Sequence, residues 1–92
     1  MDYPTDEELE KIKNWIPSKG ETWGNLFEYI KNLWKYADCG YWEESTEGWY
    51  HISTAGWSGN EELIGAMSGN RIFWLMCWHE SKRGGHYKFK LP

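Results

Sequence analysis

The sequence contains few of the residues that form metal centres or covalent cross-links. Its 92 residues include two cysteines, Cys39 and Cys77, and three histidines. Without a C-x-x-C or an H-x-x-x-H spacing, these residues provide neither a disulfide framework nor a zinc-binding motif, although a disulfide between the two cysteines stays open. No G-x-G-x-x-G or Walker-type loop occurs. We therefore expect no metal and no cofactor.

Long apolar runs and a positive net charge are also missing. No apolar run approaches membrane-spanning length, and the acidic N-terminus, Met1–Glu8, does not resemble a signal peptide, so we expect a cytoplasmic protein without a membrane partner. The formal net charge is −4, and residues 1–45 hold ten acids against five lysines. Nucleic-acid-binding proteins usually carry a basic surface, so this balance argues against a nucleic-acid partner.

Tryptophan, in contrast, is abundant, with eight residues in the chain. Burial of one indole removes about 150–250 Å² from water, so four or five rings would be sufficient for the core of so short a chain. We therefore predict that some rings face a partner. Trp74 and Trp78 lie in an apolar run and are expected in the core, whereas the positions of Trp42 and Trp57 in or beside loops leave their exposure open.

The first part of the chain, residues 1–40, is expected to be helical. Thr5 and Glu8 have the spacing of a capping box, which predicts the start of a helix that Pro17 ends. A second helix is expected to begin at Thr22 or Asn25, because a broad apolar stripe at helical spacing follows. Gly40 suits the C-terminal cap of this helix.

The second part, residues 41–92, alternates between strand and turn signals. A short helix is expected from Ser58, which has the spacing of a second capping box with Glu61. Gly84 and Gly85 fit a hairpin turn over 80–85 because glycine adopts positive φ without strain. The expected strands are 41–44, 48–54, 71–79 and 86–91. The sequence thus predicts one α+β domain over residues 1–92: two N-terminal helices, then a three- to four-stranded, mostly antiparallel sheet with one inserted short helix and a C-terminal hairpin.

A glycine-containing bend between an expected strand and the start of a helix is the first candidate site. Backbone N–H groups at such a junction point toward solvent at the positive end of a helix dipole, which suits an anion. The alternative is structural: Ser58 and Glu61 would cap each other, and the acids at 61 and 62 would repel a phosphate. The capping interpretation is favoured, and the anion site stays an alternative. The candidate binding residues of this bend are Thr54, Gly56, Trp57, Ser58 and Asn60.

The basic segment 82–86 is the second candidate. Arg83 offers a planar donor group for a carboxylate or a phosphate, and His86 can donate or accept a hydrogen bond near neutral pH. The simpler interpretation is a charged, soluble hairpin tip. If the tip lies beside the bend, Arg83 and His86 would complete a polar pocket at Trp57.

Catalytic chemistry has little support in the sequence. His51 and His79 lie on expected strands, where a structural histidine is more frequent than a ligand. Cys77 lies in an apolar run, and apolar surroundings raise the pKa of a thiol and make it inert. Ser58 does not form a nucleophile elbow, because Asn60 replaces the required glycine and the chain is too short for that sheet. We expect no catalytic residues and a protein that is not an enzyme.

Three segments occur together in an unusual combination. They are Thr54–Glu62 (TAGWSGNEE), Phe73-Trp74 with Cys77-Trp78, and Ser81 with Arg83–Tyr87 (RGGHY). In this combination, which spans roughly residues 49–89, the chain resembles small proteins of bacteriophage and prophage genomes. The resemblance implies action in the cytoplasm of an infected bacterium and carries no defined activity. Ala55 stands where those proteins often have a second glycine, which argues against a role that needs backbone freedom there.

Two functions follow from these observations. The first is a phage-type accessory protein that binds a host or anti-phage defence protein through exposed aromatic rings and a corner formed by Trp57, Arg83 and His86. Small phage accessory proteins more often bind and inhibit such factors than catalyse reactions. The alternative is a binder or sponge of a small anionic ligand, such as a nucleotide, at the Gly56–Asn60 bend.

Overall fold

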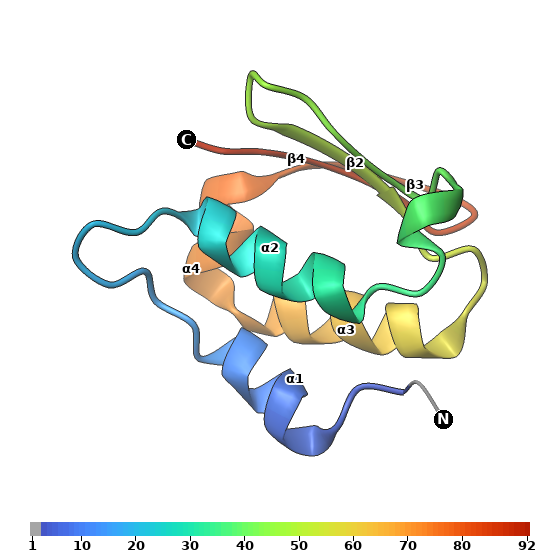
Figure 1. Cartoon of the computed structure of the whole chain (residues 1–92), viewed down its shortest axis with the longest axis horizontal. Coiled ribbons are helices and arrows are strands. Elements are labelled where there is room, and N and C mark those ends of the chain that lie inside the picture. Colours follow the sequence, from blue (N-terminus) through green and yellow to red (C-terminus); the bar gives the residue numbers. More distant parts are fainter. Residues whose placement is uncertain (1–2) are drawn as a thin grey trace.

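A four-stranded antiparallel sheet forms one layer of the molecule, and helices form the other (Figure 1). The computed structural model describes residues 3–92. The strands, in the sheet order β1-β2-β4-β3, are β1 (Trp42–Glu44), β2 (Trp49–Ser53), β3 (Trp78–Lys82) and β4 (His86–Lys90). The helices are α1 (Asp6–Lys13), α2 (Trp23–Leu33), α3 (Ser58–Gly69) and α4 (Arg71–Cys77), and a 3-10 turn, η1 (Ala37–Cys39), precedes β1. The predicted α+β fold with two N-terminal helices is confirmed.

The two predicted N-terminal helix starts are confirmed. The Thr5 hydroxyl accepts a hydrogen bond from the backbone N–H of Glu8, and the Glu8 carboxylate accepts one from the backbone N–H of Thr5. Thr22 and Asn25 form the same reciprocal arrangement at α2. The end of α2 differs from the prediction, because the helix stops at Leu33 and Gly40, at φ +89°, terminates η1 instead.

The strand predicted over 71–79 is wrong. Residues 71–77 form α4, and the chain becomes extended only at Trp78. The short helix expected from Ser58 corresponds to α3, and α4 takes the place of most of the predicted strand. Asn70 begins α4, because its side-chain oxygen accepts a hydrogen bond from the Phe73 N–H. Phe73 and Cys77 point into the core four residues apart, as on one face of a helix. The hairpin turn is correspondingly shorter than predicted and spans 83–85.

The core is an aromatic cluster between the two layers. Phe27 of α2 stacks on Tyr50 of β2 with ring centroids 3.8 Å apart. It also contacts three further rings edge-on, those of Trp42, Phe73 and Phe89. The tryptophans are divided between core and surface: Trp23, Trp34 and Trp42 are buried, Trp74 packs against the core, and Trp78 is 42% exposed. The expectation that Trp78 lies in the core is therefore wrong, and the prediction that some tryptophan rings face a partner stays a prediction.

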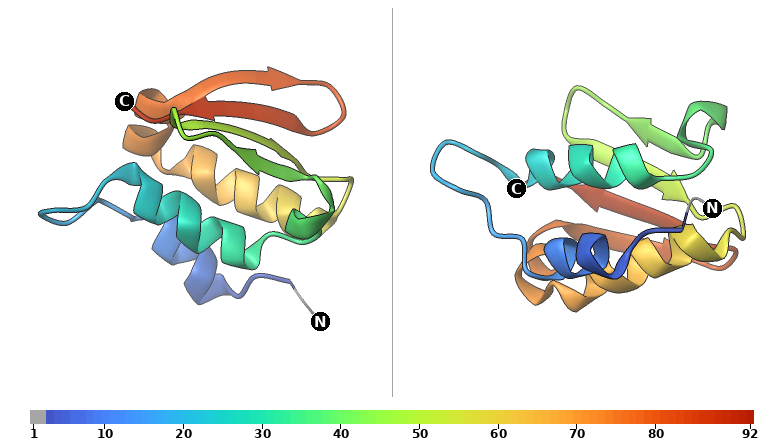
Figure 2. Two further views of the ribbon diagram at one scale, coloured as in Figure 1. Left: turned by 45° about the horizontal axis from the view of Figure 1, so that its top comes forward. Right: turned by 60° about the horizontal axis from the view of Figure 1, so that its bottom comes forward.

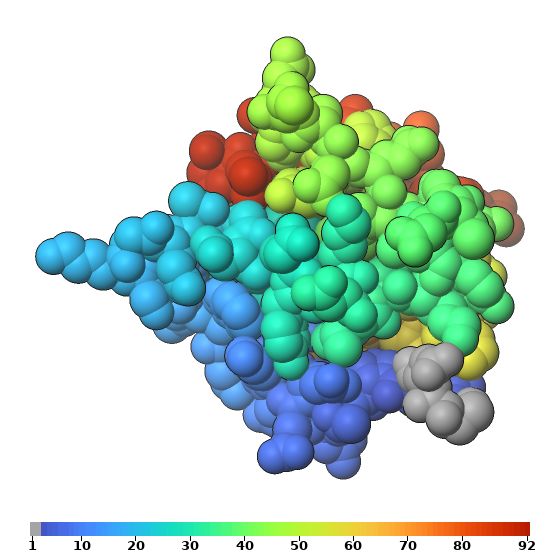
Figure 3. Space-filling view, in the orientation of Figure 1, coloured from blue at the N-terminus to red at the C-terminus, as the bar shows by residue number. Residues whose placement is uncertain are grey.

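All the helices of residues 3–92 lie on one side of the sheet, with α1 packed beneath α3 (Figures 1 and 2). The opposite side, here called the outer face, carries no helix in this part of the chain. The loop after α1 and the β1–β2 turn project from the body of the molecule (Figure 3). None of the described helices is long and apolar enough to cross a bilayer.

Asn70 connects three segments, which gives a test of the fold. Its side-chain nitrogen donates to the carbonyl oxygens of Ile12 (3.0 Å) and Trp15 (2.8 Å), while its oxygen caps α4. Because a buried hydrogen bond contributes about 1 kcal/mol, Asn70→Ala should lower the free energy of unfolding by about 2–4 kcal/mol in urea titration. Ser68→Ala, which removes an exposed hydroxyl bonded within α3, should change it by less than about 0.5 kcal/mol. Equal effects would mean that Asn70 does not connect these segments.

Candidate functional site

The outer face of the sheet carries a row of charged and histidine side chains. Strand alternation sends Tyr50 and Ile52 toward the helices and their neighbours outward. One row of side chains crosses all four strands: Glu43 lies opposite His51, His51 opposite Lys88, and Lys88 opposite Glu80. The outer face is defined by these four residues and by Trp49, Ser53, His79, Lys82, His86 and Lys90. All three histidines of the chain lie on it.

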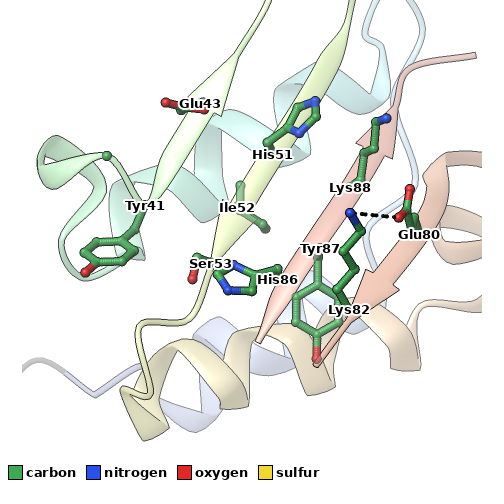
Figure 4. Close-up of a pocket in the computed structure, with 11 residues that line it drawn as sticks. Tyr41, Glu43, His51, Ile52, Ser53, Glu80, Lys82, His86, Tyr87 and Lys88 are labelled. Carbon is green, nitrogen blue, oxygen red and sulfur yellow. Dashed lines mark ion pairs between the residues drawn. The ribbon is translucent and has the colours of Figure 1, made fainter. Parts of the chain in front are cut away.

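A hollow of about 420 Å³ opens on this face (Figure 4). A second row, in which Ser53 lies opposite His86 and His86 opposite Lys82, forms its other side. The Lys82 ammonium is 3.5 Å from the Glu80 carboxylate. The residues lining the hollow are Gly40, Tyr41, Glu43, His51, Ile52, Ser53, Glu80, Lys82, His86, Tyr87 and Lys88. Its size is that of a small-ligand site.

The Trp49 indole lies beside the hollow and is surrounded by cationic groups. The ammonium groups of Lys88 and Lys90 lie 4.7 and 5.5 Å from its ring centroid. His79 meets it edge-on, with ring centroids 4.9 Å apart, and a shift in register between Trp78 and Glu80 accompanies this contact. These cation–π contacts hold two lysines in place on the outer face.

The predicted bend and the predicted hairpin tip do meet. The backbone N–H of Thr54 donates to the carbonyl oxygen of Gly85 at 3.0 Å, and Ser53 pairs with His86. Thr54 is buried and Asn60 is fully buried. The Asn60 side chain accepts from the Lys35 N–H and donates to the carbonyls of Lys35 and Thr54, so it joins the segment after α2 to the bend. Thr54 and Asn60 therefore have a structural role.

Trp57 and Ser58 are engaged by the N-terminal segment. The Trp57 indole stacks on Tyr3, with centroids 4.9 Å apart and an interplanar angle of 8°. The Ser58 hydroxyl donates to the Tyr3 hydroxyl at 3.0 Å. The capping box predicted for Ser58 and Glu61 is wrong, because α3 begins at Ser58 after Trp57 without a side-chain cap. Ala55 has φ +55°, a left-handed conformation that glycine adopts more readily than alanine.

The two remaining predicted residues, Gly56 and Arg83, are both exposed. Gly56 lies in the bend at φ +71°, and Arg83 is exposed in the turn. Among the candidate binding residues, His86 alone lines the hollow. Sequence reasoning did not connect His51 and Lys88 with His86, although the alternation within 49–53 and 86–90 places them on one face of paired strands. Lys82 joins this face from β3, a strand that the sequence did not predict at 78–82.

A second surface is apolar and lies where α4 continues into β3. Its residues, here called the α4 surface, are Ile72, Leu75, Met76 and Trp78, all of them exposed. Leu75 is 85% exposed. The Trp78 indole stacks on Trp74 at an interplanar angle of 16°, and its N–H donates to the Ser81 hydroxyl at 2.8 Å. Trp78 is thus held in one orientation with its polar group already satisfied.

Both cysteines lie among the residues that the structure describes, and they differ in exposure. Cys39 is exposed, Cys77 is buried, and both thiols are free. Burial raises the pKa of the Cys77 thiol from its ordinary value of 9.0 to about 12, which keeps it protonated and unreactive. Within residues 3–92, no group of three His, Cys, Asp or Glu side chains could hold a metal ion.

Comparison with protein-family models, with curated proteins and with solved structures finds no significant match to this chain. The two surfaces are therefore interpreted from their own geometry.

The contact between turn and bend can be tested with neighbouring glycines. Gly84 and Gly85 have φ values of +91° and +83°, so alanine at either costs about 1–2 kcal/mol of conformational strain. A Cβ at Gly85 would overlap the buried Thr54 hydroxyl, whereas one at Gly84 would make only ordinary contacts with His86. In thermal unfolding, Gly85→Ala should cost about 1–3 kcal/mol more than Gly84→Ala. Equal losses would mean that turn and bend are not in contact.

Cysteine reactivity provides a second test. A thiol reagent should modify Cys39 rapidly in the native protein and Cys77 only after unfolding, as counted by mass spectrometry.

Because the folded state favours the neutral Cys77 thiol, its contribution to stability is complete below about pH 8.5, where the unfolded thiol also stays protonated, and is lost as the pH rises toward about 12. Rapid labelling of both cysteines in the native protein would contradict the burial of Cys77.

Proposed function

We propose that this chain acts by binding a protein partner through the α4 surface. The observation that supports this most directly is the exposure of four large apolar side chains within residues 72–78, with Leu75 85% exposed. Ile72, Leu75 and Met76 are spaced three and four residues apart, so they share one face of α4. A contiguous apolar patch of this kind on a small protein typically marks an interaction site.

The composition of the α4 surface favours a protein as the occupant. Trp and Met are enriched at protein interfaces, and a tryptophan whose N–H is already bonded offers its apolar ring without leaving a polar group unsatisfied. The stacked Trp74 supports the Trp78 ring, which lowers the entropy lost on binding. Arg71 is exposed and is the one charged residue of α4. The partner expected is therefore an apolar groove with an acidic rim.

The resemblance of residues 49–89 to bacteriophage and prophage proteins suggests the identity of that partner. We propose a host or anti-phage defence protein, bound in the cytoplasm of an infected bacterium. The alternative, a small anionic ligand at the Gly56–Asn60 bend, has less support. The N–H groups of Ala55, Gly56 and Trp57 all have acceptors within the bend.

Leu75→Gln should weaken partner binding and leave the fold intact. Glutamine is a good helix former, and an exposed side chain contributes little to stability, so the free energy of unfolding should change by less than about 0.5 kcal/mol. Ile16→Gln is the matched control, since Ile16 is also apolar and 67% exposed but lies outside the α4 surface. Immobilised wild type, I16Q and L75Q are compared on bacterial extract, and each protein that L75Q alone fails to retain is identified and purified.

The decisive measurement is calorimetry with that purified protein. Wild type and I16Q should bind it with equal Kd, and L75Q at least about tenfold more weakly, because loss of an anchor residue typically costs more than about 1 kcal/mol. The proposal fails if no purified protein distinguishes L75Q from I16Q. It also fails if sedimentation shows a wild-type dimer that L75Q dissociates, because the occupant would then be a second copy of the chain.

A further inference from the structure

We propose that the hollow on the outer face binds a phosphate-bearing small ligand of about nucleotide size, with the phosphate held by Lys82 and His86. The two side chains project from directly paired positions of β3 and β4, and both line the hollow. Side chains at paired positions start about 5 Å apart, so an ammonium and an imidazole can reach oxygens of the same phosphate. This site is distinct from the α4 surface.

The distribution of charge favours an anion at this place. Residues 78–90, the β3–β4 hairpin, carry four cationic side chains against one acid, Glu80. The rest of the chain carries six cationic side chains against thirteen acids. A basic hairpin on an otherwise acidic molecule concentrates positive potential on one face, which attracts anions and repels them elsewhere.

The acidic groups near the proposed phosphate position do not prevent an anion from binding there. Glu80, the nearest acid, already forms an ion pair with Lys82, so it neutralises part of that charge and orients the ammonium. Lys88 lies opposite both His51 and Glu80, and its cation–π contact with Trp49 holds it at the edge of the hollow. Glu43 lies opposite His51 on β1, which β2 separates from β4 and the proposed phosphate position. The polar groups of the second row, Ser53, His86 and Lys82, therefore offer the more favourable end for a phosphate.

The remainder of the hollow fits an organic group attached to that phosphate. A volume of about 420 Å³ exceeds what a phosphate alone requires and lies within the range of small-ligand sites. Tyr41 lies at its rim, and its ring meets Tyr36 with centroids 6.3 Å apart, so an aromatic edge borders the hollow. This combination of basic groups and a ring favours a nucleotide-like molecule.

The test is titration of the ¹⁵N-labelled full chain with inorganic phosphate, AMP and adenosine at millimolar concentrations, followed by NMR. We expect AMP to shift the amide signals of β2, β4 and β3 around the hollow, and adenosine to leave them unchanged. If AMP binds and inorganic phosphate does not, the phosphoryl group belongs to a nucleotide. If AMP and inorganic phosphate bind equally well, the ligand is free phosphate. No binding of either, or adenosine binding as tightly as AMP, would overturn the proposal.

Matched lysine variants distinguish binding at a defined site from nonspecific electrostatic attraction to the protein. Lys82→Gln removes a cation that is paired with Glu80, and Lys13→Gln removes one that is paired with Glu10 at 3.4 Å on α1. The two variants have the same net charge. K82Q and His86→Gln should each weaken AMP binding about tenfold, because each loses a charge-assisted or neutral hydrogen bond to phosphate, while K13Q should bind as the wild type does. Equal loss in K82Q and K13Q would mean diffuse electrostatics and no site.

A single-stranded nucleic acid is a competing occupant of a basic sheet face. A decanucleotide that binds far more tightly than AMP, with a steep dependence on salt, would identify the outer face as a strand-binding surface and would overturn the small-ligand proposal. Binding of the decanucleotide no tighter than that of AMP supports it.

Discussion

The fold depends on the position of Phe27, which joins the helical layer to the sheet. Its ring contacts aromatic rings from β1, β2, α4 and β4, so one residue of α2 connects both halves of the chain. Offset-stacked and edge-on ring pairs each add about 0.5–1.5 kcal/mol beyond the burial of their area. Because this cluster needs α2 and α4 on the same side of the sheet, the helices cover that side and leave the outer face to polar residues.

That asymmetry explains where the surplus tryptophans lie. The core accepts Trp23, Trp34 and Trp42, and the indole N–H of Trp34 donates to the Ser53 carbonyl at 3.1 Å. The other five rings have specific partners: Trp57 stacks on Tyr3, Trp49 lies beneath two lysines, Trp78 stacks on Trp74, and Trp15 contacts Tyr29 and Lys11. A short chain with one covered sheet face therefore presents aromatic side chains on several sides without losing the close packing of its core.

The sequence predicts the elements whose signals are local. Reciprocal caps at Thr5 and Thr22 and the glycine pair of the hairpin depend on neighbours within a few residues, and all three are confirmed. The segment 71–79 was predicted wrongly because a short apolar run fits a buried strand and a helix equally well. The helical spacing of Phe73 and Cys77 and the capping residue Asn70 were the available signals. The outer-face hollow could not be predicted, because it requires the order β2-β4-β3, in which the paired residues of β2 and β4 lie 33–41 positions apart in the sequence.

β3 belongs to both proposed surfaces, so their occupation should be physically related. Trp78, the first residue of β3, is part of the α4 surface, while Glu80 and Lys82 line the hollow. β3 is an edge strand that pairs with β4 alone, and edge strands are held less firmly than central ones. A phosphate that joins Lys82 to His86 would add a link between β3 and β4. Ordering the strand in this way lowers the entropy lost when a partner contacts Trp78, so ligand and partner would favour each other's binding without a change in fold.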